Sequence, residues 1–272
     1  MFLLLLGCPA VDEETLTYWA IAPSDLGAGV ANDSGFDPAD GAGLGAAFAQ
    51  LLPRFGEGFP TWDVPLAMLE IASDDLVADP GSCPSAMVSG DTTTYAADCR
   101  SRAGYEWNGE YSVRRWTDGD GVSRQQYDFH LDVNGDTDDV AFDRLTLEGT
   151  VLRSELDDVV HVDSNLAASL EGYFERRGQG GDARVSSWVD WAASGSLEDD
   201  GAHVRVDLDA ETDASSGFHL GGELAIDEGC PLEPLGQADM GDGVLARFEG
   251  ADACDACATI EGDEGEAAAC VP

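Results

Sequence analysis

The feature that most constrains the fold is a two-residue alternation of apolar and polar side chains, which recurs between Thr92 and Ile260. In the stretch 204–209, two valines and a leucine alternate with an arginine and two aspartates. This period places successive side chains on opposite faces of a strand and is typical of half-buried antiparallel sheets. Turn-forming sequences such as Asn134-Gly135 separate the runs. The sequence therefore predicts a mainly β fold: an antiparallel meander of about nine or ten strands that forms a curved sheet or an open barrel.

Glycines recur at similar places in this region. The segments Leu147-Glu-Gly149, Leu170-Glu-Gly172, Ala193-Ser-Gly195 and Leu220-Gly-Gly222 follow one another at spacings of 23, 23 and 27 residues. The repeat is typical of a meander of similar strands. We expect a glycine wherever the sheet bends or two backbones approach closely.

One or two short helices are expected before the strands. A first helix is predicted over about residues 44–52, where Pro53 ends it, and a second over about residues 63–77, with Asp63 as its cap and Pro65 in its first turn. The expected organisation is a signal-peptide remnant (1–7), a lipidated tether (8–40), a small helical and loop segment (41–90), and a β domain with a cysteine-rich C-terminal region (91–272).

The charge of the chain excludes several classes of function. Among the 272 residues, 54 are acidic and 13 are basic, all of the latter arginines, which gives a formal net charge of −41. Such a surface repels phosphate backbones and anionic lipid head groups, so nucleic-acid binding and charge-driven membrane binding are disfavoured. The absence of lysine excludes Schiff-base chemistry by the chain itself. The hydrophobic fraction of 43% is sufficient for a real core.

The N-terminus begins with apolar residues that lead to Leu5-Leu6-Gly7-Cys8. This tetrapeptide resembles the lipobox of bacterial lipoprotein signal peptides. The resemblance implies export, cleavage before Cys8, acylation of Cys8, and anchoring in the cell envelope, on the periplasmic or the outer surface. Five apolar residues with no preceding Lys or Arg are fewer than a signal peptide needs, so we expect the natural chain to start upstream. The alternative is a short buried strand with Cys8 as an ordinary thiol.

The chain as a whole resembles envelope lipoproteins of high-GC bacteria, with an acidic β domain and a cysteine-rich end. Lipidation of Cys8 would leave six cysteines, and six in an exported protein predict three disulfides. Proximity favours Cys83–Cys99, and two further bridges are expected among the four C-terminal cysteines: Cys230, Cys254, Cys257 and Cys270. A redox-active CxxC or a zinc site are the alternatives for these four, but the acidic neighbours Asp252 and Asp255 disfavour a reactive thiolate.

The strongest candidate metal site is an acidic segment that resembles an EF-hand calcium loop. Asp132, Asn134, Asp136 and Asp143 match loop positions one, three, five and twelve, and calcium prefers such oxygen ligands. Thr137 replaces the usual glycine, Asp143 replaces the bidentate glutamate, and the flanks are typical of strands. The competing interpretation is a plain hairpin turn, for which Asn-Gly is a strong signal.

Histidines and aromatic residues offer two further candidate sites. The histidines are His130, His161, His203 and His219, and the first three would form a metal or acid–base site if their strands were neighbours. Neither a GxSxG nor an HExxH motif is present. Rings that could form a carbohydrate or peptide platform, or simply pack within the sheet, are Tyr105, Trp107, Tyr111, Trp116, Tyr127, Phe129, Trp188 and Trp191.

Three hypotheses of function follow. The leading one is a non-enzymatic envelope lipoprotein with a structural or binding role, whose lipid on Cys8 contacts the membrane and whose partner is a protein or a carbohydrate. The second is a calcium- or ligand-binding module that uses the acidic turn 132–143 or the aromatic sheet. The third is a hydrolase with a site that the sequence does not reveal. No cofactor is expected, apart from calcium under the second hypothesis.

Overall fold

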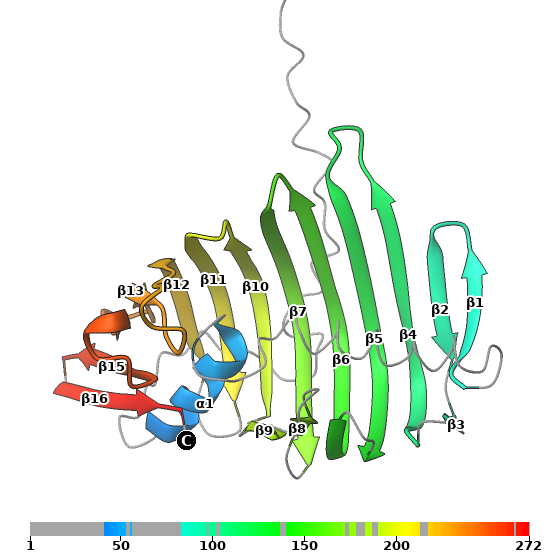
Figure 1. The fold of residues 1–272 in the computed structure, drawn as a ribbon, viewed down its shortest axis with the longest axis horizontal. Coiled ribbons are helices and arrows are strands. Elements are labelled where there is room, and N and C mark those ends of the chain that lie inside the picture. Colours follow the sequence, from blue (N-terminus) through cyan, green and yellow to red (C-terminus); the bar gives the residue numbers. More distant parts are fainter. Residues whose placement is uncertain are drawn as a thin grey trace, which may run out of the picture.

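The computed structural model is dominated by one antiparallel sheet of 16 strands (Figure 1). It describes residues 41–52, 55, 83–96, 98–101, 104–136, 140–171, 174–177, 183–186, 190–212, 217–263 and 265–271. The elements are α1 (Gly41–Leu51), β1 (Ser85–Ser89), β2 (Thr92–Ala96), β3 (Cys99–Arg100), β4 (Glu106–Thr117), β5 (Ser123–Asp136), β6 (Val140–Leu156), β7 (Val159–Glu171), β8 (Phe174–Arg177), β9 (Ala183–Ser186), β10 (Trp191–Asp199), β11 (His203–Thr212), β12 (Phe218–Ala225), β13 (Leu235–Asp239), β14 (Leu245–Glu249), the 3₁₀ turn η4 (Gly250–Asp252), β15 (Cys257–Gly262) and β16 (Gly265–Cys270).

The expected antiparallel meander is confirmed, and the sheet is open. Thirteen strands follow one another in the order β1-β2-β4-β5-β6-β7-β10-β11-β12-β13-β14-β15-β16, while β3, β8 and β9 pair beside this path. The prediction of nine or ten strands was therefore too low. Two of the additional strands, β1 and β16, are short and rich in alanine, serine and glycine. Such small side chains give little alternation to detect.

One helix lies within the described residues, and it matches the first of the two that the sequence predicted. The second predicted helix, 63–77, lies outside the described residues, as do the segments 1–7 and 8–40 with Cys8. The division of the chain into four segments stays a prediction.

One face of the sheet carries the core. Tyr111, Phe129, Gly149, Leu166 and Ala193 stand opposite one another on successive strands from β4 to β10, and the four with side chains are almost fully buried. Because the side-chain period is two, every second residue of each strand joins this apolar layer. Burial of each large apolar side chain contributes about 1.5–3 kcal/mol relative to its exposure.

Two of the recurring glycines lie where the sequence predicted close backbone approach. Gly149 and Gly195 have φ angles of 128° and 143°. A Cβ atom at Gly149 would lie 2.1 Å from the carbonyl oxygen of Asn165, and one at Gly195 would lie 2.0 Å from that of Asp207. Only glycine tolerates both the backbone angle and the contact. These residues allow neighbouring strands to approach closely and the sheet to bend.

Helix α1 packs against the C-terminal half of β16, at the outer edge of the strand (Figure 1). The Cα atoms of Cys257 and Cys270, which are paired across β15 and β16, lie 4.0 Å apart, the short spacing of a non-hydrogen-bonded pair. The carbonyl of Cys270 therefore points away from β15, towards the helix. A Cβ atom at Gly45 would lie 1.9 Å from this oxygen. The absence of a side chain at Gly45 thus lets α1 pack against the strand edge.

Three disulfides join the cysteines that the sequence singled out: Cys83–Cys99, Cys230–Cys254 and Cys257–Cys270. The predicted pairing of Cys83 with Cys99 is confirmed, as is the pair of bridges in the C-terminal region. The Cys254–Cys257 motif is not an internal disulfide, since each of its cysteines bonds to a different partner. Each bridge restricts the conformations of the unfolded chain and thereby stabilises the folded state by roughly 2–4 kcal/mol.

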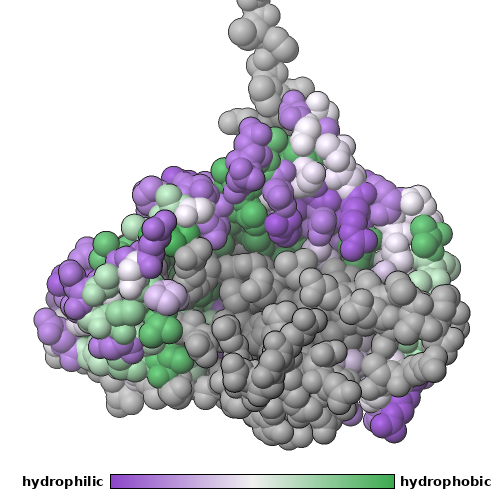
Figure 2. Space-filling view, viewed as in Figure 1, coloured by the Kyte–Doolittle hydropathy of each residue, from purple (hydrophilic) through white to green (hydrophobic). Residues whose placement is uncertain are grey.

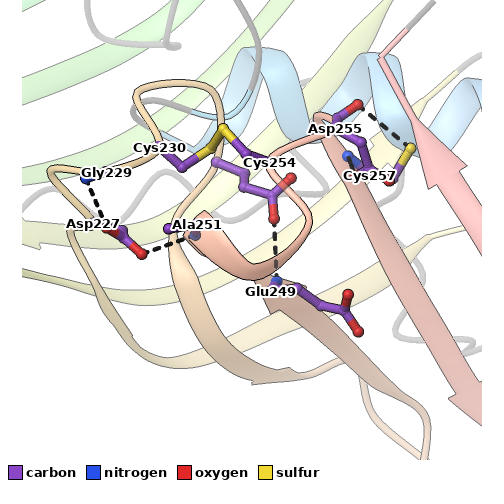
Figure 3. The surroundings of a disulfide bond; sticks show 9 residues. Asp227, Gly229, Cys230, Glu249, Ala251, Cys254, Asp255 and Cys257 are labelled. Atoms are coloured by element: carbon purple, nitrogen blue, oxygen red, sulfur yellow. Dashed lines mark hydrogen bonds between the residues drawn. A yellow bond between two sulfur atoms is a disulfide. The ribbon is translucent and has the colours of Figure 1, made fainter.

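A carboxylate organises the loops around the Cys230–Cys254 bridge (Figure 3). Asp227 accepts hydrogen bonds of 2.8 Å from the backbone N–H groups of Gly229 and Ala251. These donors lower the pKa of Asp227, so the side chain stays ionised and keeps both loops in place. Nearby Glu233 is 1% exposed. Its burial raises its pKa, although hydrogen bonds from backbone N–H groups act in the opposite direction.

We expect Gly45→Ala to destabilise the protein. In an exposed helix interior this change stabilises by up to about 1 kcal/mol. Here the new methyl group meets the backbone of Cys270, and overpacking costs about 1–3 kcal/mol. Urea unfolding of the two proteins measures the difference. A variant at least as stable as the parent would contradict the close packing of α1 on β16.

Candidate ligand-binding site

The face of the sheet opposite the core is polar, and its few arginines are paired with carboxylates. Arg205 on β11 stands opposite Glu198 of β10 and Glu223 of β12, and it binds them at 2.5 and 2.8 Å. Arg114 pairs with Asp91, and Arg247 with Glu261, each at 2.9 Å. Exposed pairs of this kind add little stability individually. Their effect is to neutralise part of the acidic surface by cross-strand pairing.

A pocket of about 320 Å³ lies on the described part of this sheet, across β6, β7, β10 and β11. Its centre is one cross-strand row: Glu148, Ala167, Ala192 and Glu211 stand opposite one another in that order. The two alanines leave a hollow between the two longer glutamates. Successive strands are about 4.8 Å apart, so the backbones of the two glutamates are separated by roughly 14 Å.

The remaining lining has polar side chains on one side of this row. Thr146 and Ser169, paired across β6 and β7, supply hydroxyl groups, and Asp190 supplies a third carboxylate. Ala168, Trp191 and Thr212 complete the lining. Among the described lining residues there is no arginine, so the pocket is electronegative. On its outer side Glu148 contacts His130, with 2.5 Å between the carboxylate oxygen and Nδ1.

One buried polar atom on the polar-face side of the lining has no hydrogen-bond partner within the described structure: Oε2 of Glu211. Nε1 of Trp191 also has no partner, but the register of β10 places this side chain on the core face with Ala193. Buried polar groups are nearly always hydrogen-bonded, and leaving one without a partner costs about 1–3 kcal/mol. A carboxylate oxygen without a partner beside the pocket is a reason to expect that the pocket binds a polar ligand.

The predicted calcium ligands lie on two paired strands. Asp132, Asn134 and Asp136 belong to β5, and Asp143 belongs to β6. Pairing of the two strands continues to Asp136 opposite Ala141, so the segment forms a hairpin, but Asn134-Gly135, the predicted turn, lies within β5 at a register shift. The carboxylate of Asp132 binds Arg144 at 2.5 Å. Residues 137–139 lie outside the described residues, and calcium binding stays a prediction.

The described structure does not bring the histidines together. His130 lies on β5, His161 on β7, His203 on β11 and His219 on β12, and each has its own carboxylate partner: Glu148, Asp163, Asp200 and Asp209, respectively. Within the described ranges, no group of three or more His, Cys, Asp or Glu side chains is arranged to hold a metal ion. The proposed convergence of His130, His161 and His203 is therefore wrong, because their rows in the sheet differ.

The aromatic residues of the first strands belong to the core. Tyr105, Trp107, Tyr111, Tyr127 and Phe129 are each at most 4% exposed. Tyr111 stacks on Tyr95 with ring centres 4.6 Å apart, and burial raises its pKa well above the usual range. Trp116 instead lies under the guanidinium of Arg114. These observations support packing rather than an exposed platform, and Trp188 lies outside the described residues.

Comparison with protein-family models, with curated proteins and with solved structures finds no match for this chain. The one described α-helix is too short to cross a membrane.

The sequence did contain a signal for the pocket. Leu166-Ala167-Ala168 and Trp191-Ala192-Ala193 are runs of three apolar residues that break the two-residue alternation. Each run places an alanine on the polar face, and the two alanines become neighbours only through the pairing of β7 with β10. The signal was missed because neither run shows which strand lies beside it.

The pKa of His161 offers a test of the polar face. Its hydrogen bond with Asp163 and its proximity to Glu198 raise the pKa of His161, with burial acting in the opposite direction. A raised folded-state pKa stabilises the fold fully below the unfolded value of about 6.5, and the stabilisation is lost as pH rises through the folded value. We therefore expect His161→Gln to destabilise more at pH 5 than at pH 8.

Chemical denaturation of the parent and the His161→Gln variant at both pH values measures this difference. In parallel, NMR titration should show the pKa of His161 falling in Asp163→Asn. An unchanged pKa in that variant would contradict the assigned hydrogen bond.

Proposed function

We propose that this protein is a non-enzymatic binding protein of the cell envelope, anchored through a lipid on Cys8. Its three disulfides support an oxidising compartment outside the cytoplasm, because such bonds persist there and are rare in the cytosol. Mass spectrometry of the protein from its native host tests the anchor. An unmodified leader, still attached to Cys8, would contradict it.

The ligand we propose for the pocket is a small linear organic cation with an amine towards each end. The observation that carries this proposal is the row Glu148–Ala167–Ala192–Glu211, in which two carboxylates flank a hollow with an alanine floor. Ammonium groups donate hydrogen bonds to carboxylates, and a methylene chain can lie on the alanines between them.

Charge and size support an organic cation over other ligands. The described lining has three carboxylates and no arginine, so an anion would be repelled. The two glutamates are separated by roughly 14 Å of backbone spacing, which is too far for both to coordinate one metal ion. A volume of about 320 Å³ lies at the lower end of the range for small-molecule sites.

Isothermal titration calorimetry with spermidine tests this proposal. We expect saturable binding that weakens about 10- to 100-fold in Glu211→Gln, since a hydrogen bond to a charged group contributes about 1.5–3 kcal/mol. Ala192→Leu should abolish binding, because the new side chain fills the hollow.

Glu266→Gln is the matched control, since it removes the same charge from an exposed position on β16. It should change the affinity by no more than about twofold, the weak effect of a distant, screened charge. Equal weakening by both glutamine variants would mean that spermidine binds the acidic surface at large. Absence of saturable binding by the parent would reject this ligand class.

A further inference from the structure

The two outer edges of the sheet differ in their protection. Edge strands expose unpaired backbone groups, and proteins usually cover them or place charges on them. The edge of β16 is covered by α1 along its C-terminal half and carries Glu266 in its N-terminal half. The edge at the other end, β1, pairs among the described strands with β2 alone, and all five of its residues are exposed.

Strand β1 is also the place where large apolar side chains are most exposed in the described structure. Met87 is 68% exposed and Val88 is 71% exposed, the two highest values among the exposed large hydrophobic residues. Figure 2 shows hydrophobic colour at the end of the molecule formed by β1 and β2. Both faces of the strand, as well as its edge, are therefore open to a partner.

This strand carries no charge, in contrast to the rest of the chain. Residues 80–90 contain no acidic or basic side chain, although the protein has a formal net charge of −41. The nearest acid in the sequence, Asp91, is paired with Arg114 at 2.9 Å. Two copies of this acidic protein would repel each other over most orientations. An approach through β1 avoids that repulsion locally.

The backbone groups of β1 are suited to a symmetric partner. Ser89 pairs with Thr92 across a two-residue turn, so Ser85, Met87 and Ser89 exchange hydrogen bonds with β2. The N–H and C=O groups of Ala86 and Val88 then point to the free edge. In an antiparallel copy centred on Met87, Ala86 would face Val88 of the second copy and each pair would exchange both hydrogen bonds.

We propose that β1 is a self-association edge, through which two copies of this chain join their sheets by antiparallel β1–β1 pairing. The side chains are self-complementary in this register: Met87 meets its own copy, Ala86 meets Val88, and the flanking serines meet each other. The contact is small compared with a stable interface, so the dimer is weak and strengthens with protein concentration and with salt, which screens the net charge.

Cysteine cross-linking tests the register. Met87→Cys should form a disulfide-linked dimer under mild oxidation, because directly opposite residues in a non-hydrogen-bonded pair have Cα atoms about 4.5 Å apart. Val88→Cys is the matched control: two such residues would be offset by roughly 7 Å along the strands, beyond disulfide reach. Both changes are made in the full chain with Cys8→Ser, so that one cysteine remains outside the three disulfides.

We expect at least tenfold more cross-linked dimer from Met87→Cys than from Val88→Cys. Equal cross-linking of the two variants would reject the register, and none from either would reject the proposal. The latter result is also the one expected if β1 serves to bind a strand of another protein.

Sedimentation velocity of the unmodified full chain gives an independent measurement. A dimer that increases with salt is expected, and it should be lost in Val88→Pro, which removes an outward N–H without removing a bond to β2. Val88→Thr keeps that N–H and should retain the dimer. A parent that stays monomeric at high concentration and high salt would overturn the proposal, as would a Val88→Pro variant that dimerises like the parent.

Discussion

The structure depends on the register of its antiparallel ladder. A shift of one residue between two strands would move every apolar side chain of the shifted strand from the core to the polar face. The pairing is continuous from β1 to β16, so the same register that buries Phe129 beside Gly149 also aligns Glu148 with Ala167 on the opposite face. The core and the pocket are thus two consequences of one alignment.

Charge explains much of what the polar face looks like. With 54 acids and 13 arginines, the carboxylates cannot all form ion pairs. One arginine can pair with several carboxylates, as Arg205 does with Glu198, Asp200 and Glu223. No arginine is among the described residues that line the pocket. An electronegative hollow is costly without a counter-charge, which is the physical reason for proposing that a cation occupies it.

Much of the fold could be predicted from the sequence, because its main signals are local. Alternation along each strand, the turns between strands, and glycines such as Gly149 are properties of a few consecutive residues. The disulfide Cys83–Cys99 also followed from proximity. The short strands could not be counted, since a segment such as Ser85–Ser89 gains its structure from its neighbour rather than from its own pattern.

The candidate site was the least predictable part. Four of its residues come from four strands, and their alignment is a property of the pairing, which no single segment encodes. The sequence drew attention instead to residues with familiar chemistry, such as Asp132 and His161. The structure gives these residues partners of their own, Arg144 and Asp163.

Backbone amide NMR during addition of spermidine addresses the central claim most directly. If the cation occupies the pocket, saturating chemical-shift changes will centre on Glu148, Ala167, Ala192 and Glu211 and leave the β13–β16 end of the sheet unaffected. Small, non-saturating changes spread over acidic residues of the whole molecule would contradict the claim, because they would show that the pocket has no preference over the rest of the charged surface.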